Sequence, residues 1–153
     1  MLTSYEIFKK LPGTWIFERT LNNLLQPQSS GVVNGHAKFI PVHGTQNLIH
    51  YLETGIFETK GGAKYPITKE YFFAFNEQTH NIEKYFAEHG AKSGLFYVLG
   101  QDLSGEHLCV KDNYKARYNY LDDDFQEFSI NYEVTGPQKN YSSETRYKNK
   151  HDL

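Results

Sequence analysis

The sequence is built from long strand-like stretches that are separated by short turns. Turn-forming residues interrupt the chain at, for example, Gly61-Gly62, Ser104-Gly105 and Gly136-Pro137, and β-branched, aromatic and alternating residues fill the stretches between them. Because the connections are short, consecutive strands are expected to pair as antiparallel hairpins. The predicted strands cover residues 14–25, 31–42, 46–59, 64–76, 80–89, 94–101, 106–121, 125–135 and 140–149.

One short helix is expected ahead of the first strand, over residues 4–11. Tyr5, Phe8 and Leu11 recur there at helical spacing. Ser4 can cap its start, and a Pro-Gly pair follows its end. No other stretch of the chain reads as a helix.

A sheet of this many strands must hide its edges. An open sheet would expose two edges and one apolar face, whereas closure into an up-and-down barrel removes the edges. We therefore predict a single domain over residues 1–153. Its fold is an all-β, up-and-down antiparallel barrel of eight to ten strands, with the helix covering one end. A two-sheet sandwich is the alternative.

The interior is expected to be aromatic. The chain has 12 tyrosines, 11 phenylalanines and one tryptophan, which make up 16% of its residues, while all hydrophobic residues together reach only 39%. In several stretches, such as 70–75, both faces of the predicted strand carry apolar side chains. A closed sheet of about eight strands has room inside for side chains or for one small ligand. The sequence thus favours a cavity with aromatic walls and some polar groups.

Charge and composition argue against several classes of protein. The 16 basic and 18 acidic side chains give a net charge of -2, which provides no electrostatic footprint for nucleic acid or an anionic membrane. Cys109 is the only cysteine, so no intrachain disulfide can form. The N-terminal residues lack the apolar core of a signal peptide, and we expect a cytoplasmic protein. The oligomeric state is left open.

Two groups of residues resemble known families. The opening Leu11–Trp15 resembles the G-x-W start of lipocalin-type barrels. A larger ordered set is similar to the uncharacterised family known as domain of unknown function 6314, over Leu11 to about Lys148. The set comprises Tyr51, Glu53, Gly55, His107, Cys109, Asp112, Tyr114, Tyr118, Gly136-Pro137, Lys139, Tyr141 and Arg146-Tyr147. This resemblance implies a calycin-like barrel, similar to lipocalins and fatty-acid-binding proteins, with no established activity.

The chain also departs from that family pattern at two places. The segment Gly90–Tyr97 lacks an arginine of the pattern, and Asn140 stands where the pattern has an aspartate. If those groups carry chemistry in relatives, this protein could bind a ligand without performing the same reaction.

The lipocalin-type opening implies a contact between two side chains at the closed end of the barrel. In such barrels the tryptophan packs across the closed end beneath an arginine from the last segment of the chain. The resemblance therefore implies that Trp15 is buried and that Arg146 stacks on its ring as a cation–π pair.

A polar cluster is expected inside the barrel. Arg19 is in phase with Trp15 and Phe17, which points it inward. Its guanidinium could anchor a carboxylate or phosphate, or it could pair internally with Glu53 or Asp112. The predicted ligand-binding cluster consists of Arg19, Glu53, His107, Asp112, Tyr114 and Lys139.

The spacing of four of these candidates raises a geometric conflict. On one continuous strand over 106–121, His107 and Cys109 face one side and Asp112 faces the other, together with Tyr114. All of them can point inward only if a β-bulge falls near Val110–Lys111. The simpler interpretation is a small buried cysteine, a hydrogen-bonded histidine, and an Asp112 that accepts backbone amides at a turn.

Three functions are compatible with this sequence. The leading hypothesis is a barrel that binds a small, partly apolar ligand, anionic if Arg19 anchors it. The first alternative is an enzyme of isomerase, cyclase or hydrolase type, with His107 as acid or base, Asp112 as its orienter and Tyr114 as proton donor. The second is a filled barrel that contacts other proteins. No metal or other cofactor is expected, although a haem site needs only one axial histidine and stays open.

Overall fold

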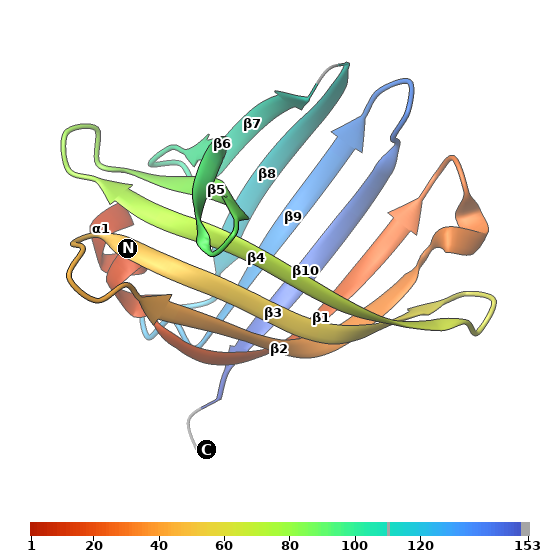
Figure 1. The fold of residues 1–153 in the computed structure, drawn as a ribbon, viewed down its shortest axis with the longest axis horizontal. Coiled ribbons are helices and arrows are strands. Elements are labelled where there is room, and N and C mark those ends of the chain that lie inside the picture. The colour runs from red at the N-terminus through yellow and green to blue at the C-terminus, as the bar shows by residue number, and fades with distance from the viewer. Residues whose placement is uncertain (110, 151–153) are drawn as a thin grey trace.

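A computed structural model describes residues 1–109 and 111–150 of the chain (Figure 1). It contains one α-helix, one 3₁₀ turn and ten strands. In chain order they are α1 (Ser4–Lys10), β1 (Gly13–Asn23), η1 (Pro27–Ser29), β2 (Gly31–Pro41), β3 (Leu48–Thr59), β4 (Lys64–Asn76), β5 (Asn81–Glu88), β6 (Ala91–Leu99), β7 (Ser104–Cys109), β8 (Asp112–Tyr120), β9 (Glu127–Thr135) and β10 (Tyr141–Asn149).

The ten strands form one antiparallel sheet that curls into a nearly closed barrel. Their order is β6-β5-β4-β3-β2-β1-β10-β9-β8-β7, so each strand lies beside its neighbour in sequence and β10 lies beside β1. The two end strands, β6 and β7, come together without a hydrogen-bonded ladder between them in the described residues. A Cβ at Gly105 would lie 2.5 Å from the Val98 carbonyl oxygen, so only glycine permits this approach. The predicted up-and-down barrel is confirmed, and the sandwich alternative is wrong.

The predicted strand over 106–121 is in fact a hairpin. β7 ends at Cys109 and β8 begins at Asp112, and the two strands pair with His107 opposite Tyr114 and Cys109 opposite Asp112. Residues directly opposite each other in an antiparallel pair share a face. All four therefore lie on the same face because the chain reverses, and the expected bulge is not needed. Val110, on which that bulge was predicted, lies outside the described residues.

The N-terminal helix covers one end of the barrel. Its cap is Thr3 rather than Ser4: the Glu6 amide donates to the Thr3 hydroxyl at 3.1 Å, and the Thr3 amide donates to the Glu6 carboxylate at 3.0 Å. Phe8 is buried, and its ring centroid lies 5.9 Å from that of Phe75 on β4. Within the described residues, no helix is long and apolar enough to cross a membrane.

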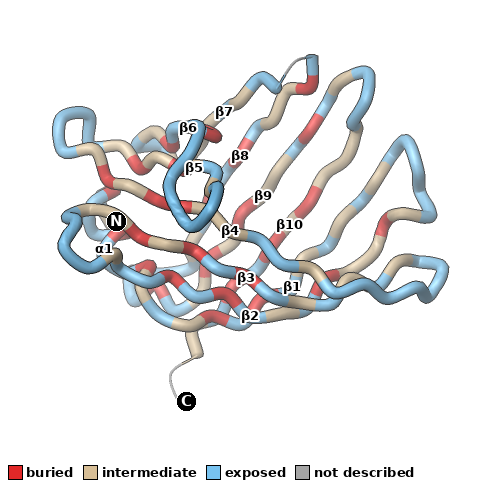
Figure 2. Tube along the Cα trace, viewed as in Figure 1, coloured by how far each residue is buried: buried red, intermediate tan, exposed pale blue. Residues whose placement is uncertain are grey.

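The core below the helix is aromatic, as Figure 2 shows by the buried segments that recur along the strands. Trp15 is fully buried and donates its indole N–H to the Leu11 carbonyl at 2.9 Å. The rings of Phe39, Phe125 and Phe128 meet it edge-on, with Phe128 closest at 4.8 Å between centroids. This end of the barrel is therefore filled by packed rings.

The predicted stack of Arg146 on Trp15 is wrong. Arg146 lies between the buried Thr145 and Tyr147 on β10, so alternation turns it to the outer surface. Its side chain is 75% exposed and pairs with Glu144 at 3.1 Å. The inner position belongs to Tyr147, whose ring stacks on Phe128 at 4.5 Å between centroids.

Candidate functional site

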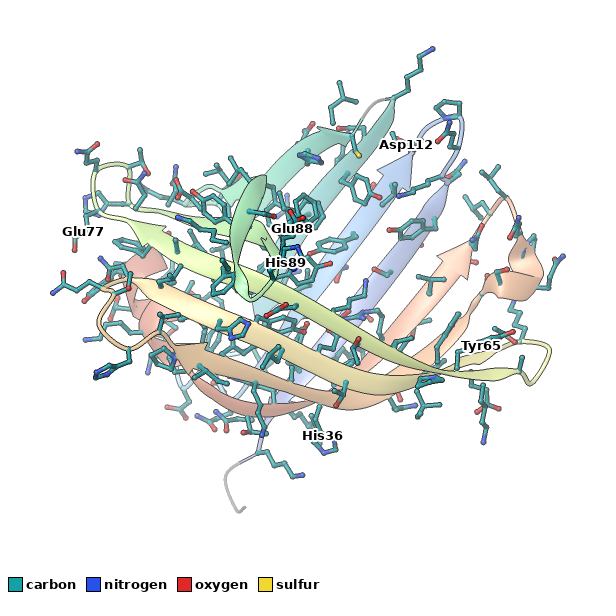
Figure 3. All side chains as sticks on the ribbon, in the orientation of Figure 1. His36, Tyr65, Glu77, Glu88, His89 and Asp112 are labelled. Carbon is teal, nitrogen blue, oxygen red and sulfur yellow. The ribbon has the colours of Figure 1, made fainter. Side chains whose placement is uncertain are left out.

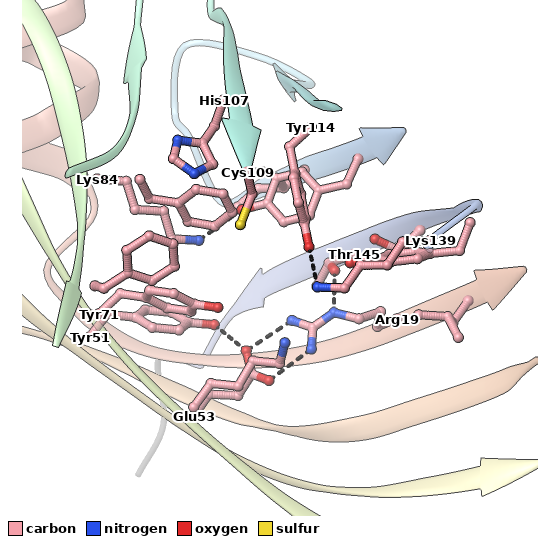
Figure 4. A pocket seen from close by; sticks show the side chains of 18 of the residues that line it. Arg19, Tyr51, Glu53, Tyr71, Lys84, His107, Cys109, Tyr114, Lys139 and Thr145 are labelled. Atoms are coloured by element: carbon pink, nitrogen blue, oxygen red, sulfur yellow. Dashed lines mark hydrogen bonds and ion pairs between the residues drawn. The ribbon is translucent and has the colours of Figure 1, made fainter. Parts of the chain in front are cut away.

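A cavity of ≈ 350 Å³ occupies the part of the barrel that the aromatic core leaves empty (Figure 4). Every strand except β2 contributes side chains to its wall. The inward positions of β2 nearby are Gly35 and the buried Ala37, which are too small to reach into the space. Aromatic rings form much of the wall, and five charged side chains lie among them: those of Arg19, Glu53, Lys69, Lys84 and Lys139.

The floor of the cavity holds an ion pair. Both terminal nitrogens of Arg19 donate to the Glu53 carboxylate at 2.8 Å, and its Nε donates to the Thr145 hydroxyl at 2.7 Å. The Tyr51 hydroxyl donates to Glu53 at 2.5 Å and lies 2.9 Å from the Tyr147 hydroxyl. The Glu53 side chain is only 1% exposed. The pair is thus a buried, bidentate contact whose lone pairs and protons are largely satisfied.

This arrangement keeps both members of the pair charged. Burial raises the pKa of Glu53, but the hydrogen bonds and charge of Arg19, with the Tyr51 hydroxyl, outweigh burial and hold that pKa below its usual value. Burial lowers the pKa of Arg19, and the bonds to Glu53 more than reverse this effect. Arg19 therefore faces the cavity with its charge already neutralised.

Lys84 is the deepest cation of the site. It is 5% exposed, and its Nζ donates to the Tyr132 hydroxyl at 2.8 Å. The Tyr71 ring lies beneath it, 4.0 Å from Nζ to centroid. Burial, followed by the positive charge of Lys69, lowers the pKa of Lys84 well below its ordinary value.

A network of tyrosine hydroxyls continues from Lys84. The Tyr97 hydroxyl lies 2.8 Å from the Tyr132 hydroxyl and also bonds to the hydroxyl of Tyr118. Burial is the main cause that raises the pKa of all three tyrosines, so each keeps its proton. The network is consequently a chain of neutral hydroxyls that can both donate and accept.

The open end of the cavity carries the other predicted residues. The Lys139 Nζ donates to the Tyr114 hydroxyl at 2.8 Å, and this bond is the main cause that raises the pKa of Lys139. The His107 ring lies edge-on to Phe96, 5.5 Å between centroids. Cys109 also lines the cavity but is exposed, which corrects the expectation of a buried thiol.

Asp112 does not belong to the cavity wall. It is buried near the loop between β9 and β10 (Figure 3), and its carboxylate accepts the backbone amides of Gln138 and Lys139 at 3.3 and 3.2 Å. Arg19, the ion-pair partner considered from sequence, bonds to Glu53 instead. Its position is that of a turn-supporting aspartate, the simpler of the two interpretations.

Five of the six predicted ligand-binding residues line one cavity: Arg19, Glu53, His107, Tyr114 and Lys139. In the described structure His107 forms no hydrogen bond with Asp112 or Tyr114, and the centroid of its ring lies 6.3 Å from that of Tyr114.

Sequence reasoning missed Lys84 and the tyrosines around it as site residues. On β5, Lys84 alternates in phase with Ile82 and Phe86 and so shares their inward face, but Tyr85 and Ala87 on the other face obscure which face is buried.

The possible metal ligands among the described residues are dispersed. No group of three histidine, cysteine, aspartate or glutamate side chains comes together among residues 1–109 and 111–150. The polar groups of the cavity are mainly amines and hydroxyls, which are poor metal ligands when protonated.

Fold and cavity together define an antiparallel up-and-down β-barrel with an internal, aromatic pocket. The chain belongs to the family of unknown function DUF6314, which matches residues 11–149. No curated protein matches it.

Two solved structures share the fold. An S-type phycobiliprotein lyase from Guillardia theta is similar with a TM-score of 0.66 and 8% identity, over 99% of this chain and 95% of that one. A fluorescence-activating β-barrel designed de novo is similar with a TM-score of 0.50 and 10% identity, over 98% of this chain and 100% of that one.

Proposed function

We propose that this protein binds a small, partly apolar ligand with an anionic group, inside the barrel. The observation that carries the proposal is the composition of the cavity wall. Lys69, Lys84, Lys139 and Arg19 line it together with a single acidic residue, Glu53, among the described residues. Because Arg19 and Glu53 neutralise each other, Lys69 and Lys139 leave the pocket with an excess of positive charge.

The two parts of the ligand follow from where these groups lie. Lys69 and Lys139 line the cavity but are exposed, so they suit an anionic group at the open end. Phe96 and Tyr132, which are less exposed, offer ring surface deeper in the wall. Ligand sites commonly combine apolar walls with a few placed polar groups, and ≈ 350 Å³ lies at the small end of their size range.

The other two hypotheses receive less support. A filled barrel is disfavoured by the cavity itself. The enzyme hypothesis depended on a bonded His107, Asp112 and Tyr114, and Asp112 is committed to backbone amides of the β9–β10 loop.

A pair of fluorescent probes tests the binding proposal. 1-Anilinonaphthalene-8-sulfonate carries an anionic group, and N-phenyl-1-naphthylamine has nearly the same rings without it. We expect the sulfonate to bind more tightly, and the double change Lys69→Gln with Lys139→Gln to remove that preference. Lys38→Gln, on the outer face of β2, is the matched control and should leave both affinities unchanged.

Equal affinities of the two probes would contradict the anionic part of the proposal, and failure of both to bind would contradict the cavity site. Native mass spectrometry of the protein from its own cells would then show whether a natural ligand accompanies it.

A further inference from the structure

Within the described structure, Lys84 is buried without the ion-pair partner that would explain a lysine at this position. A buried ammonium normally has a carboxylate partner, because leaving water without one is strongly unfavourable. Among the described residues, no carboxylate forms an ion pair with Lys84, and its one hydrogen bond goes to the neutral Tyr132 hydroxyl. Glu53, the acid of the cavity, is already bound by Arg19 and Tyr51.

The surroundings of Lys84 are nonetheless open to a ligand. Its side chain lines the cavity, and six aromatic rings lie within 5.9 Å of Nζ: those of Tyr51, Tyr71, Phe73, Phe96, Tyr97 and Tyr132. Figure 4 shows the amine directed into this space above Tyr71 and Tyr51. An amine at the inner end of a ligand pocket, next to a hydroxyl, is the arrangement that captures a carbonyl group.

The geometry points to a covalent, reversible ligand site, in which the Lys84 amine forms an imine with an aldehyde or ketone of a ligand held in the cavity. This inference rests on the proposed function and adds the chemical class of the ligand's buried end. The ligand would then carry a carbonyl group at the Lys84 end and its anionic group at the Lys69 and Lys139 end.

The chemical step balances without an oxidant or reductant. The Nζ lone pair attacks the carbonyl carbon, the C–N bond forms, and a proton passes from nitrogen to oxygen to give a carbinolamine. The Tyr132 hydroxyl, 2.8 Å from Nζ, is placed to relay that proton, with Tyr97 behind it. Loss of the hydroxyl group and one further proton as water leaves the C=N bond.

The charges around Lys84 support an uncharged amine. The groups that face it are Tyr51 and Glu53 on β3, Lys69 and Tyr71 on β4, Tyr97 on β6, Tyr132 on β9 and Arg19 on β1. Burial is the first cause that lowers the pKa of Lys84; Lys69 and Arg19 lower it further and Glu53 opposes them. A larger share of Lys84 is therefore nucleophilic at neutral pH than of a surface lysine.

The test uses 4-formylbenzoate, which places an aldehyde and a carboxylate at opposite ends of one ring. The full-length protein is mixed with it at neutral pH, sodium borohydride reduces any imine, and peptide mapping identifies the modified lysines. Lys84 should carry the reduced adduct at least about tenfold more than Lys92, which corresponds to one unit of pKa difference. Lys92 is the matched control, since its Nζ also lies over a tyrosine ring, at 4.3 Å, but on an exposed residue.

Two variants sharpen the result. Lys84→Met should remove most of the reduced 4-formylbenzoate adduct from the protein, whereas Lys92→Met should leave the adduct at Lys84 unchanged. Because the modified lysine is read from the wild-type peptide map, the outcome does not depend on whether Lys84→Met folds. Adducts on exposed lysines with Lys84 unmodified would overturn the inference.

The same samples separate this inference from the binding proposal. 4-(Hydroxymethyl)benzoate has the same shape without the carbonyl, and its binding is measured by displacement of 1-anilinonaphthalene-8-sulfonate. Displacement by the alcohol with no adduct at Lys84 would overturn the imine and leave the binding site standing. An adduct at Lys84 without any sulfonate binding would support the imine and contradict the proposed anionic preference.

Discussion

Arg19 and Glu53 form a bidentate ion pair across the inside of the barrel, although β2 separates their strands in the sheet. On β2, Val33 lies opposite Arg19 and Ala37 lies opposite Glu53, and the small Gly35 between them leaves room for the contact. A larger side chain at Gly35 is excluded, since a Cβ there would lie 2.1 Å from the Thr54 carbonyl oxygen. The small residues of β2 and the long charged ones of its neighbours are thus parts of one arrangement.

Removing one member of this pair should be strongly destabilising. Arg19→Met leaves the Glu53 carboxylate buried without its cation, and the free energy of unfolding should fall by about 3–5 kcal/mol. Urea unfolding followed by tyrosine fluorescence measures the change. Adding Glu53→Leu to Arg19→Met should restore part of the loss; if it lowers stability by a further similar amount, the pair is not acting as a unit.

The outer surface supplies the matched control for that experiment. Arg146 and Glu144 form an exposed ion pair at 3.1 Å. Arg146→Met should change the free energy of unfolding by less than about 1 kcal/mol, because exposed pairs contribute little.

Lys84 should make the stability of the protein depend on pH. Its pKa in the folded protein lies well below the ordinary 10.5, so the unfolded chain binds the extra proton over the pH range between the two values. Stability should therefore rise with pH up to about 10.5 and fall as the pH drops toward the folded pKa. Lys84→Met should flatten this slope and be equally stable or more stable at neutral pH. Thermal unfolding across pH checks it, and a slope unchanged by Lys84→Met but altered by Lys92→Met would contradict it.

Trp15 should be a principal source of stability. Trp15→Ala removes a fully buried ring and the indole bond to Leu11, and about 3–5 kcal/mol of unfolding free energy should be lost. Leu121→Ala, at a residue that is 76% exposed, is the control for apolar truncation and should have little effect. A loss below about 1 kcal/mol for Trp15→Ala would show that this end of the barrel is not held by the ring.

Asp112 should affect stability without affecting binding. Asp112→Ala leaves the Gln138 and Lys139 amides without their acceptor, which should cost about 1–3 kcal/mol. The affinity for 1-anilinonaphthalene-8-sulfonate should stay within about twofold, because the Asp112 carboxylate does not reach the cavity. A tenfold loss of affinity with unchanged stability would show that Asp112 takes part in ligand binding.

The fold could be predicted because its local signals agree with one another. Strand-like stretches with frequent turn residues indicated hairpins, and the need to hide strand edges indicated closure. The reversal between Cys109 and Asp112 escaped prediction because no glycine or proline lies there. Without that signal β7 and β8 read as one strand, and a bulge was needed where a turn exists.

The site was predictable only in part, for two physical reasons. Alternation on β1 placed Arg19 inside, and the same rule applied to β10 would have placed Arg146 outside, where the lipocalin resemblance suggested otherwise. Lys84 needed knowledge of which face of β5 is buried, and strand patterning with apolar residues on both faces does not reveal it. Contacts such as that of Lys84 with Tyr132, 48 residues apart, depend on closure of the whole sheet.

The gap in hydrogen bonding between β6 and β7 has a mechanical consequence. In a fully paired barrel, strand number and stagger fix the radius, so the wall resists expansion everywhere. In the described residues, no ladder of backbone hydrogen bonds joins β6 to β7, and Phe86, Phe96 and His107 line the cavity beside that gap. Widening the barrel at this gap breaks no ladder of backbone hydrogen bonds. Widening it beside Arg19 on β1 would break the ladders that β1 forms with β2 and with β10. The barrel wall is therefore easier to widen between β6 and β7 than between strands that are paired by backbone hydrogen bonds.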